Sequence, residues 1–92
     1  MATIIKIDGS KVEITPEQDN GELSYEQLSK AVGGYIELVP VQNPALKGKT
    51  MFCNEEGKLK GMAPNLEATK LAGLTYDVLV GDVILCEPGE VS

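Results

Sequence analysis

Three short polar clusters carry the side chains that could hold a ligand. The first runs from Asn54 to Lys58 and resumes at Asn65, so amides, a carboxylate and an ammonium lie close together in the sequence. Such groups supply hydrogen-bond donors and acceptors together with both signs of charge. The candidate ligand-binding residues of this cluster are Asn54, Glu55, Lys58 and Asn65. The same pattern also suits an ordinary turn followed by a helix cap.

The second cluster pairs an aromatic ring with a carboxylate. Tyr35 and Glu37 are two residues apart in a β-branched, apolar stretch, so they would share one face of a strand. A ring and a carboxylate on one exposed face can stack on and orient a ring of a ligand, which makes both candidate ligand-binding residues. Alternatively, Tyr35 packs against a helix end and Glu37 faces water.

The third cluster is a basic loop in an acidic chain. Lys47 and Lys49 flank a glycine and are candidate contacts for an anion. The alternative is a solvated loop without a ligand.

The sequence offers no catalytic or metal-binding set. Histidine, the usual acid–base catalyst at neutral pH, is absent. Glu55 and Glu56 are consecutive residues in an expected turn, so their side chains should point apart. Cys53 and Cys86 lie in apolar runs and are expected to be buried, reduced thiols. Two cysteines without histidine cannot complete a zinc site. We therefore expect no catalytic residue, no metal and no cofactor.

Composition limits the partners. Ninety-two residues suit a single domain over residues 1–92. The net charge of −6 and the lack of arginine argue against a nucleic-acid partner. No apolar run approaches the roughly 20 residues that span a bilayer, and the N-terminus does not resemble a secretion signal. These features predict a cytoplasmic protein without a membrane partner.

The N-terminal half is predicted to form a β-hairpin followed by a helix. Residues 3–7 and 11–14 are rich in β-branched side chains and flank turn residues, as in a hairpin. A Ser-x-x-Gln capping box begins at Ser24, so a helix is expected from there to Val32. Gly33 supplies its stop, because glycine adopts the left-handed conformation at low cost.

The second half alternates extended segments with one short helix. Strands are expected over residues 35–39 and 50–53, a helix over 66–72 with Asn65 as its cap, and extended segments over 78–80 and 83–86. Gly57 is expected to take a positive φ in the turn before Lys58. Gly81 is expected to be either a bulge or a hairpin turn. Residues 87–92 are expected to form a frayed tail.

This order of elements predicts the fold class. Hairpin, helix, strand, strand, short helix and strand indicate an α+β protein with a β-grasp-like mixed sheet of four to five strands. One main helix, over residues 24–32, is expected to cover the sheet, with the short second helix beside it.

Two motifs also resemble a known family. The run VGGYIE at residues 32–37, and NEEGKL at residues 54–59 followed by Pro64-Asn65, resemble small proteins from phages, prophages and other mobile elements. That family is known as a domain of unknown function, and the likeness covers most of residues 3–87. This chain departs from the pattern at Met62-Ala63, where members tend to have Leu-Pro, and it lacks an arginine after Asn65.

The resemblance implies a biological context more than a mechanism. The leading hypothesis is a non-enzymatic phage or prophage accessory binding protein, with a counter-defence role, in the cytoplasm of the host cell. It would sequester a small anionic, nucleotide-like ligand between subunits of a homo-oligomer, or occupy a host protein through an exposed sheet edge. The alternative is a ubiquitin-like protein-interaction module without conjugation, because the chain does not end in two glycines. An unrecognised enzyme is the third hypothesis.

Overall fold

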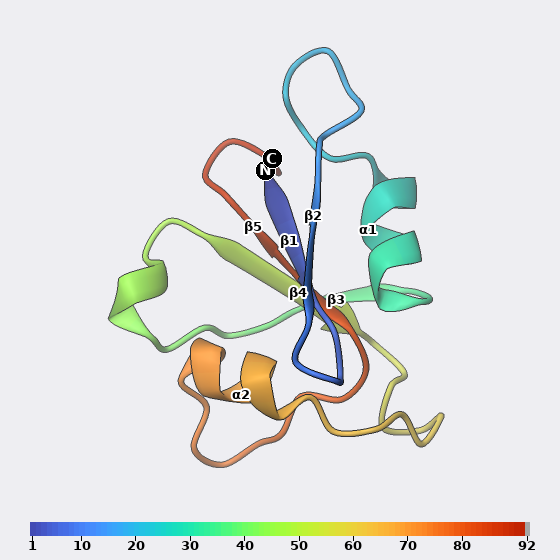
Figure 1. Cartoon of the computed structure of the whole chain (residues 1–92), viewed down its shortest axis with the longest axis vertical. Coiled ribbons are helices and arrows are strands. Elements are labelled where there is room, and N and C mark those ends of the chain that lie inside the picture. Colours follow the sequence, from blue (N-terminus) through green and yellow to red (C-terminus); the bar gives the residue numbers. More distant parts are fainter. Residues whose placement is uncertain (92) are drawn as a thin grey trace.

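The computed structural model of this chain describes residues 1–91 and contains five strands and two α-helices within them (Figure 1). The α+β class predicted from the sequence is therefore confirmed. The elements in chain order are β1 (Ala2–Ile5), β2 (Lys11–Ile14), α1 (Tyr25–Val32), β3 (Ile36–Leu38), a 3-10 turn (Pro44–Leu46), β4 (Thr50–Asn54), α2 (Leu66–Ala72) and β5 (Val83–Cys86).

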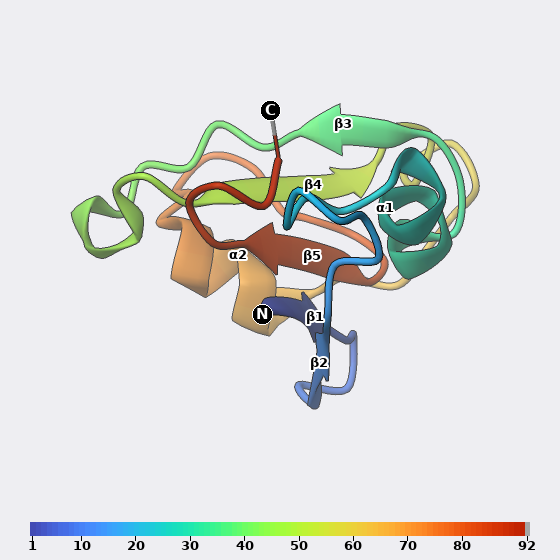
Figure 2. The same ribbon diagram turned by 90° about the horizontal axis from the view of Figure 1, so that it is seen from above.

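All five strands form one sheet in the order β2-β1-β5-β4-β3. Every strand pair in it is antiparallel, so the mixed sheet expected for a β-grasp-like arrangement is wrong. The last strand lies in the middle, where Leu85 pairs with Thr3 on one side and with Met51 on the other. All four residues of β5 are buried, as expected for a strand with both neighbours and both faces covered. Figure 2 shows β4 lying between β3 and β5.

Each face of the sheet packs against a different helix. Side chains alternate along a strand, so Val83 and Leu85 of β5 face one way and Ile84 and Cys86 the other. The first pair packs with Ala68 and Ala72 of α2, and the second pair with Leu28 and Val32 of α1. In Figure 1 the strands run between α1 on the right and α2 at the lower left. The expectation of one main covering helix is corrected accordingly, because α2 covers the opposite face.

Both helices begin and end where the local sequence predicts. The Ser24 hydroxyl accepts a hydrogen bond from the Gln27 N–H at 3.1 Å, and the Gln27 side chain accepts one from the Ser24 N–H. Gly33 follows α1 with φ 81°, a left-handed conformation that suits glycine. Asn65 caps α2 and Gly73 ends it. No helix within residues 1–91 is long and apolar enough to cross a membrane.

The loop after β4 differs from the expected turn. Gly57 does not take a positive φ, and Gly61, with φ 67°, does so instead. Gly57 is buried, and a Cβ atom built on it would lie 2.8 Å from Cγ2 of Val80. A glycine stands at position 57 because another chain segment approaches its backbone closely, and not because of its φ angle.

The segment before β5 is less regular than predicted. Within residues 78–80, only Val80 forms a β-bridge, and it pairs with Pro64 in isolation. Gly81 has φ 75° and donates its N–H to the Ala63 carbonyl at 2.8 Å. It is therefore a bend between that bridge and β5, and both expected alternatives, bulge and hairpin turn, are corrected.

The frayed tail expected over residues 87–92 is wrong for residues 87–91. Glu90 is only 7% exposed, and its side chain accepts the N–H of Glu87 at 2.7 Å. The Glu90 carbonyl accepts the N–H of Leu23 at 2.7 Å, and Val91 packs beside the α1 core. Residue 92 lies outside the described residues.

Candidate functional site

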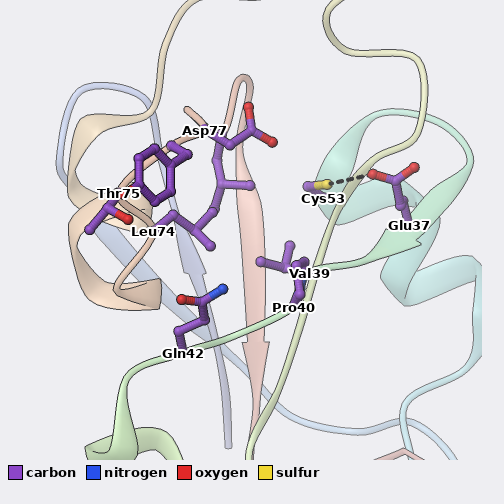
Figure 3. Close-up of a pocket in the computed structure, with 10 residues that line it drawn as sticks. Glu37, Val39, Pro40, Gln42, Cys53, Leu74, Thr75 and Asp77 are labelled. Carbon is purple, nitrogen blue, oxygen red and sulfur yellow. Dashed lines mark hydrogen bonds between the residues drawn. The ribbon is translucent and has the colours of Figure 1, made fainter.

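A groove lies on the α2 side of the sheet, between β3–β4 and the segment of residues 74–80. It consists of two adjoining cavities of about 190 and 260 Å³. The residues that line both cavities are Glu37, Cys53, Asp77 and Leu79. Figure 3 shows the first cavity, with Glu37 and Cys53 on one side and Leu74, Thr75 and Asp77 on the other. We call the two cavities together the β3 groove.

The β3 groove has an apolar floor and an apolar rim. Val39 and Leu79, both buried, form the floor with the half-buried Leu74. On the rim, Tyr76 is fully exposed and Leu59 is 87% exposed. Exposed aromatic and aliphatic side chains gathered around a hollow are typical of binding surfaces.

Glu37 enters the groove from β3. It lies opposite Cys53 of β4, and the Cys53 thiol points toward Oε2 of Glu37 at 4.0 Å (Figure 3). Glu37 is exposed, and no ion pair involves it within residues 1–91. Its carboxylate is therefore available to a cation from outside the chain.

The Cys53 thiol is held in its neutral form. Burial raises the pKa of Cys53, and the negative charges of Glu37 and Asp77 raise it further. A thiol acts as a nucleophile only as thiolate, so the surroundings of Cys53 work against covalent catalysis.

Lys58 and Asp77 join the two walls of the groove. They form an ion pair between the loop that follows β4 and the segment that follows α2. The hydrogen bond from Lys58 and that from the Val78 N–H lower the pKa of the Asp77 carboxyl below its usual value. Asp77 therefore stays ionised in all but strongly acidic solution.

The structure brings four of the six candidate ligand-binding residues to one cavity. These residues are Glu37, Asn54, Glu55 and Lys58. Asn54, however, is buried, and its side chain donates to the Val32 carbonyl at 3.1 Å and accepts the Glu56 N–H at 2.8 Å. Its amide joins the end of α1 to the loop after β4 and has a structural role.

Asn65 is fully buried and lies outside the groove. Its side chain accepts from the Ala68 N–H at 3.0 Å and donates to the carbonyls of Ile5 at 2.8 Å and Gly81 at 2.9 Å. With its amide committed to these three bonds, Asn65 caps α2 and ties it to the sheet. The prediction that Asn65 contacts a ligand is therefore wrong.

The remaining candidates lie elsewhere. Tyr35 is 64% exposed next to β3 and does not line either cavity, although its carbonyl accepts the Glu55 N–H at 2.8 Å. Lys47 and Lys49 precede β4, whereas the groove cavity with Lys58 lies at the end of β4. Lys49 pairs with Glu87 at 3.3 Å, and Lys47 is exposed. The basic loop and the groove are thus separate features.

Sequence analysis missed the second wall of the groove. Tyr76 and Asp77 line it, and both come from the stretch between α2 and the bridge at Val80. The available signal was a polar Thr-Tyr-Asp run that begins two residues after Gly73, the glycine that ends α2. A run of this kind favours an exposed loop, but it does not indicate that the loop faces β3.

The outer edge of β3 lies beside the groove. The Tyr35 carbonyl accepts the N–H of Glu55, the residue after β4, at 2.8 Å, and the Val39 N–H donates to the Met51 carbonyl of β4 at 2.9 Å. Since hydrogen bonding alternates along an antiparallel strand, the backbone groups of Ile36 and Leu38 point away from the sheet. Within residues 1–91 neither has a hydrogen-bond partner on that side.

Charge in the groove is predominantly negative. Glu37, Glu55 and Asp77 line it, and the ammonium of Lys58 is already paired with Asp77. An anion would meet an excess of negative charge there, whereas a cation would find the unpaired Glu37 carboxylate. No group of three His, Cys, Asp or Glu side chains in the described part of the chain is placed to hold a metal ion.

Comparison with known proteins gives one match. A family model described as a domain of unknown function (DUF3846) matches residues 1–91. No curated protein matches the chain. No solved structure matches it either.

Proposed function

We propose that this chain, which belongs to the DUF3846 family of domains of unknown function, is a non-enzymatic protein that binds an extended segment of another protein at the outer edge of β3. The partner would add a strand beside Ile36 and Leu38 and place side chains in the β3 groove. Strand addition of this kind draws its affinity from backbone hydrogen bonds and its specificity from pockets for alternate side chains.

The open edge of β3 carries this proposal. Ile36 and Leu38 present backbone N–H and C=O groups without partners in residues 1–91, and Leu38 is 61% exposed. The other edge strand, β2, carries the charged side chains of Lys11 and Glu13, which are typical of edges protected against pairing. β3 has Ile36 and Leu38 in the comparable positions, so it is the edge better suited to a partner.

The chemistry of the groove favours binding over catalysis. The Cys53 thiol is kept protonated, and the Asp77 carboxylate is ionised and paired with Lys58. A general base or acid at neutral pH needs a pKa near the working pH. Neither residue has that property.

The family resemblance suggests the setting. The motifs VGGYIE and NEEGKL, at residues 32–37 and 54–59, supply the start of β3 and the loop beside the groove. In the proposal the chain is a phage or prophage accessory protein that occupies a host protein in the host cytoplasm, with a counter-defence role. A ubiquitin-like interaction module would share this binding mode, but the antiparallel sheet gives that alternative less support. Sequestration of an anionic ligand fits the acidic groove poorly.

Proline substitutions at the two sheet edges test the proposal. Leu38→Pro removes an outward N–H that no internal bond uses, and Glu13→Pro makes the same change at the edge of β2. Affinity purification from a lysate of the bacterium that harbours the gene should recover one stoichiometric protein partner with the wild type. Glu13→Pro should retain this partner, and Leu38→Pro should lose it at least tenfold.

A folding control and two possible results decide whether the edge of β3 is the binding site. Circular dichroism first establishes that both variants are folded. Retention of the partner by Leu38→Pro, or equal loss with Glu13→Pro, would show that the edge of β3 is not the binding site. Recovery of a nucleotide in place of a protein would support the ligand-sequestering alternative.

A further inference from the structure

The register of β3 fixes which side chains a bound strand would meet. Ile36 and Leu38 face the α1 side of the sheet, where Ile36 packs beside Phe52. Glu37 faces the opposite side and lines the β3 groove. In a strand added to the edge, side chains alternate in the same way, so one residue would lie opposite Glu37 and its two neighbours opposite Ile36 and Leu38.

The position opposite Glu37 is suited to a positive charge. The Glu37 carboxylate has no ion-pair partner in residues 1–91, and Asp77 and Glu55 line the same cavity. Opposite charges placed directly across two strands stabilise their pairing, and like charges destabilise it. Both the local groove and the net charge of −6 therefore favour a basic side chain.

A second copy of this chain does not complement the edge. A symmetric antiparallel pairing that uses all of β3 on both copies would place Glu37 directly opposite Glu37. The groove would then contain two facing carboxylates in addition to Asp77. Because like charges directly across two strands repel, the edge favours a different partner.

We infer that the segment bound at the edge of β3 has a lysine or arginine flanked by two apolar residues, with the basic side chain directed into the β3 groove toward Glu37. This inference rests on the proposed function. It adds the chemistry of the partner, which is an extended apolar–basic–apolar sequence. The rim residues Leu59 and Tyr76 would cover the aliphatic stem of the basic side chain, as such stems commonly pack on apolar surface.

Two synthetic peptides that differ at one residue test the inference. Both are extended and soluble, and their centres read Val-Lys-Val and Val-Glu-Val. Titration into isotopically labelled protein at low ionic strength, followed by NMR, should shift the amide signals of Ile36 and Leu38. The lysine peptide should bind about fivefold more tightly than the glutamate peptide, a ratio consistent with one cross-strand charge pair.

Reversing the charge of Glu37 tests whether this residue causes the preference between the two peptides. Glu37→Lys should reverse the order of the two peptides, because its ammonium now faces the variable residue. Glu13→Lys makes the same change of net charge on β2 and should leave the original preference intact. Both side chains are exposed, so both variants should fold.

The outcomes separate this inference from the proposed function. Equal affinity of the two peptides, or an unchanged preference in Glu37→Lys, would overturn the charge inference and leave strand addition in place. If neither peptide shifts the amides of Ile36 and Leu38, both ideas are wrong. If those amides shift with protein concentration alone, a second copy occupies the edge, and the inference is again wrong.

Discussion

Two buried asparagine side chains hold the loops around the β3 groove in place. Asn54 bonds to the end of α1, and Asn65 bonds to β1, α2 and the bend at Gly81. A buried amide must satisfy its donors and acceptor within the protein, and both residues do so. At the scale of single residues, this leaves Glu37, Glu55 and Lys58 as the charged groove candidates that a partner can reach.

Removing the Asn65 amide should destabilise the protein strongly. Asn65→Ala deletes a helix cap and leaves two buried carbonyls, those of Ile5 and Gly81, without that donor. A lost cap and unsatisfied buried groups together cost about 3 kcal/mol. Urea denaturation followed by circular dichroism measures the free energy of unfolding.

A matched control for this variant is Asn20→Ala. The Asn20 side chain accepts only the exposed N–H of Glu22, so its loss should cost less than about 1 kcal/mol. If Asn65→Ala lowered the free energy of unfolding as little as Asn20→Ala, the structural role of Asn65 would be contradicted. Asn65 would then again be a candidate ligand contact.

At the scale of elements, the loop of residues 55–61 forms a wall of the groove because it packs closely on a neighbouring segment. The Met62 N–H bonds to the Gly57 carbonyl at 3.0 Å, and Gly57 lies against Val80. The Lys58–Asp77 ion pair adds a second link between the same two segments. The loop is thus held from two sides, which keeps Lys58 at the mouth of the groove.

A methyl group at position 57 should disturb this packing. In Gly57→Ala the new Cβ would lie 2.8 Å from Cγ2 of Val80, whose branched side chain has little freedom to move. We expect a loss of about 1–3 kcal/mol in the free energy of unfolding, as for overpacked sites. NMR shifts should be concentrated in residues 55–61 and 74–80.

Gly21→Ala serves as the comparison for Gly57→Ala. Gly21 has φ 82° and open space around it, so Gly21→Ala should lower the free energy of unfolding through backbone strain alone. Its NMR shift changes should remain near residue 21. Stability unchanged by Gly57→Ala would show that the loop does not depend on close packing with Val80.

Local chemistry explains which elements could be predicted from the sequence. The capping box at Ser24 and the stop at Gly33 involve residues close together in the chain, so both helices were placed correctly. Strand partners and helix placement depend on residues far apart. The central position of β5, the antiparallel sheet and the separate face covered by α2 therefore had no local signal. For the same reason the groove was found only in part, since Asp77 joins Lys58 across 19 positions.

At the scale of the whole molecule, titrating groups should limit stability at both ends of the pH range. The pKa of Asp8 is lowered by hydrogen bonds from Ser10, and that of Asp77 by its bond from Lys58. Because their folded pKa values lie below the unfolded 3.8, their contribution is present above pH 3.8 and lost as pH falls through the folded values. In Asp77→Asn, the free energy of unfolding should fall less at acidic pH than it does in the wild type.

The buried Cys86 thiol should limit stability at alkaline pH, because its contribution is lost as pH rises. Burial, and the charges of Glu90 and Glu87 after it, raise the pKa of Cys86 from 9.0 to about 12. The unfolded thiol therefore ionises first, and stability should fall as pH rises from 9 toward 12. Urea denaturation across this range should show the fall in the wild type and a shallower one in Cys86→Ala. An identical slope in the variant would contradict this assignment.

The place of β5 in the sheet has a consequence for synthesis of the chain on the ribosome. In the sheet, the β1–β2 pair and the β3–β4 pair are connected by strand pairing only through β5, which begins at Val83. During translation both hairpins emerge before the strand that joins them. A two-stranded hairpin is marginally stable by itself, so the nascent chain should stay unstructured until β5 leaves the exit tunnel. Folding of this domain is then a late and concerted event.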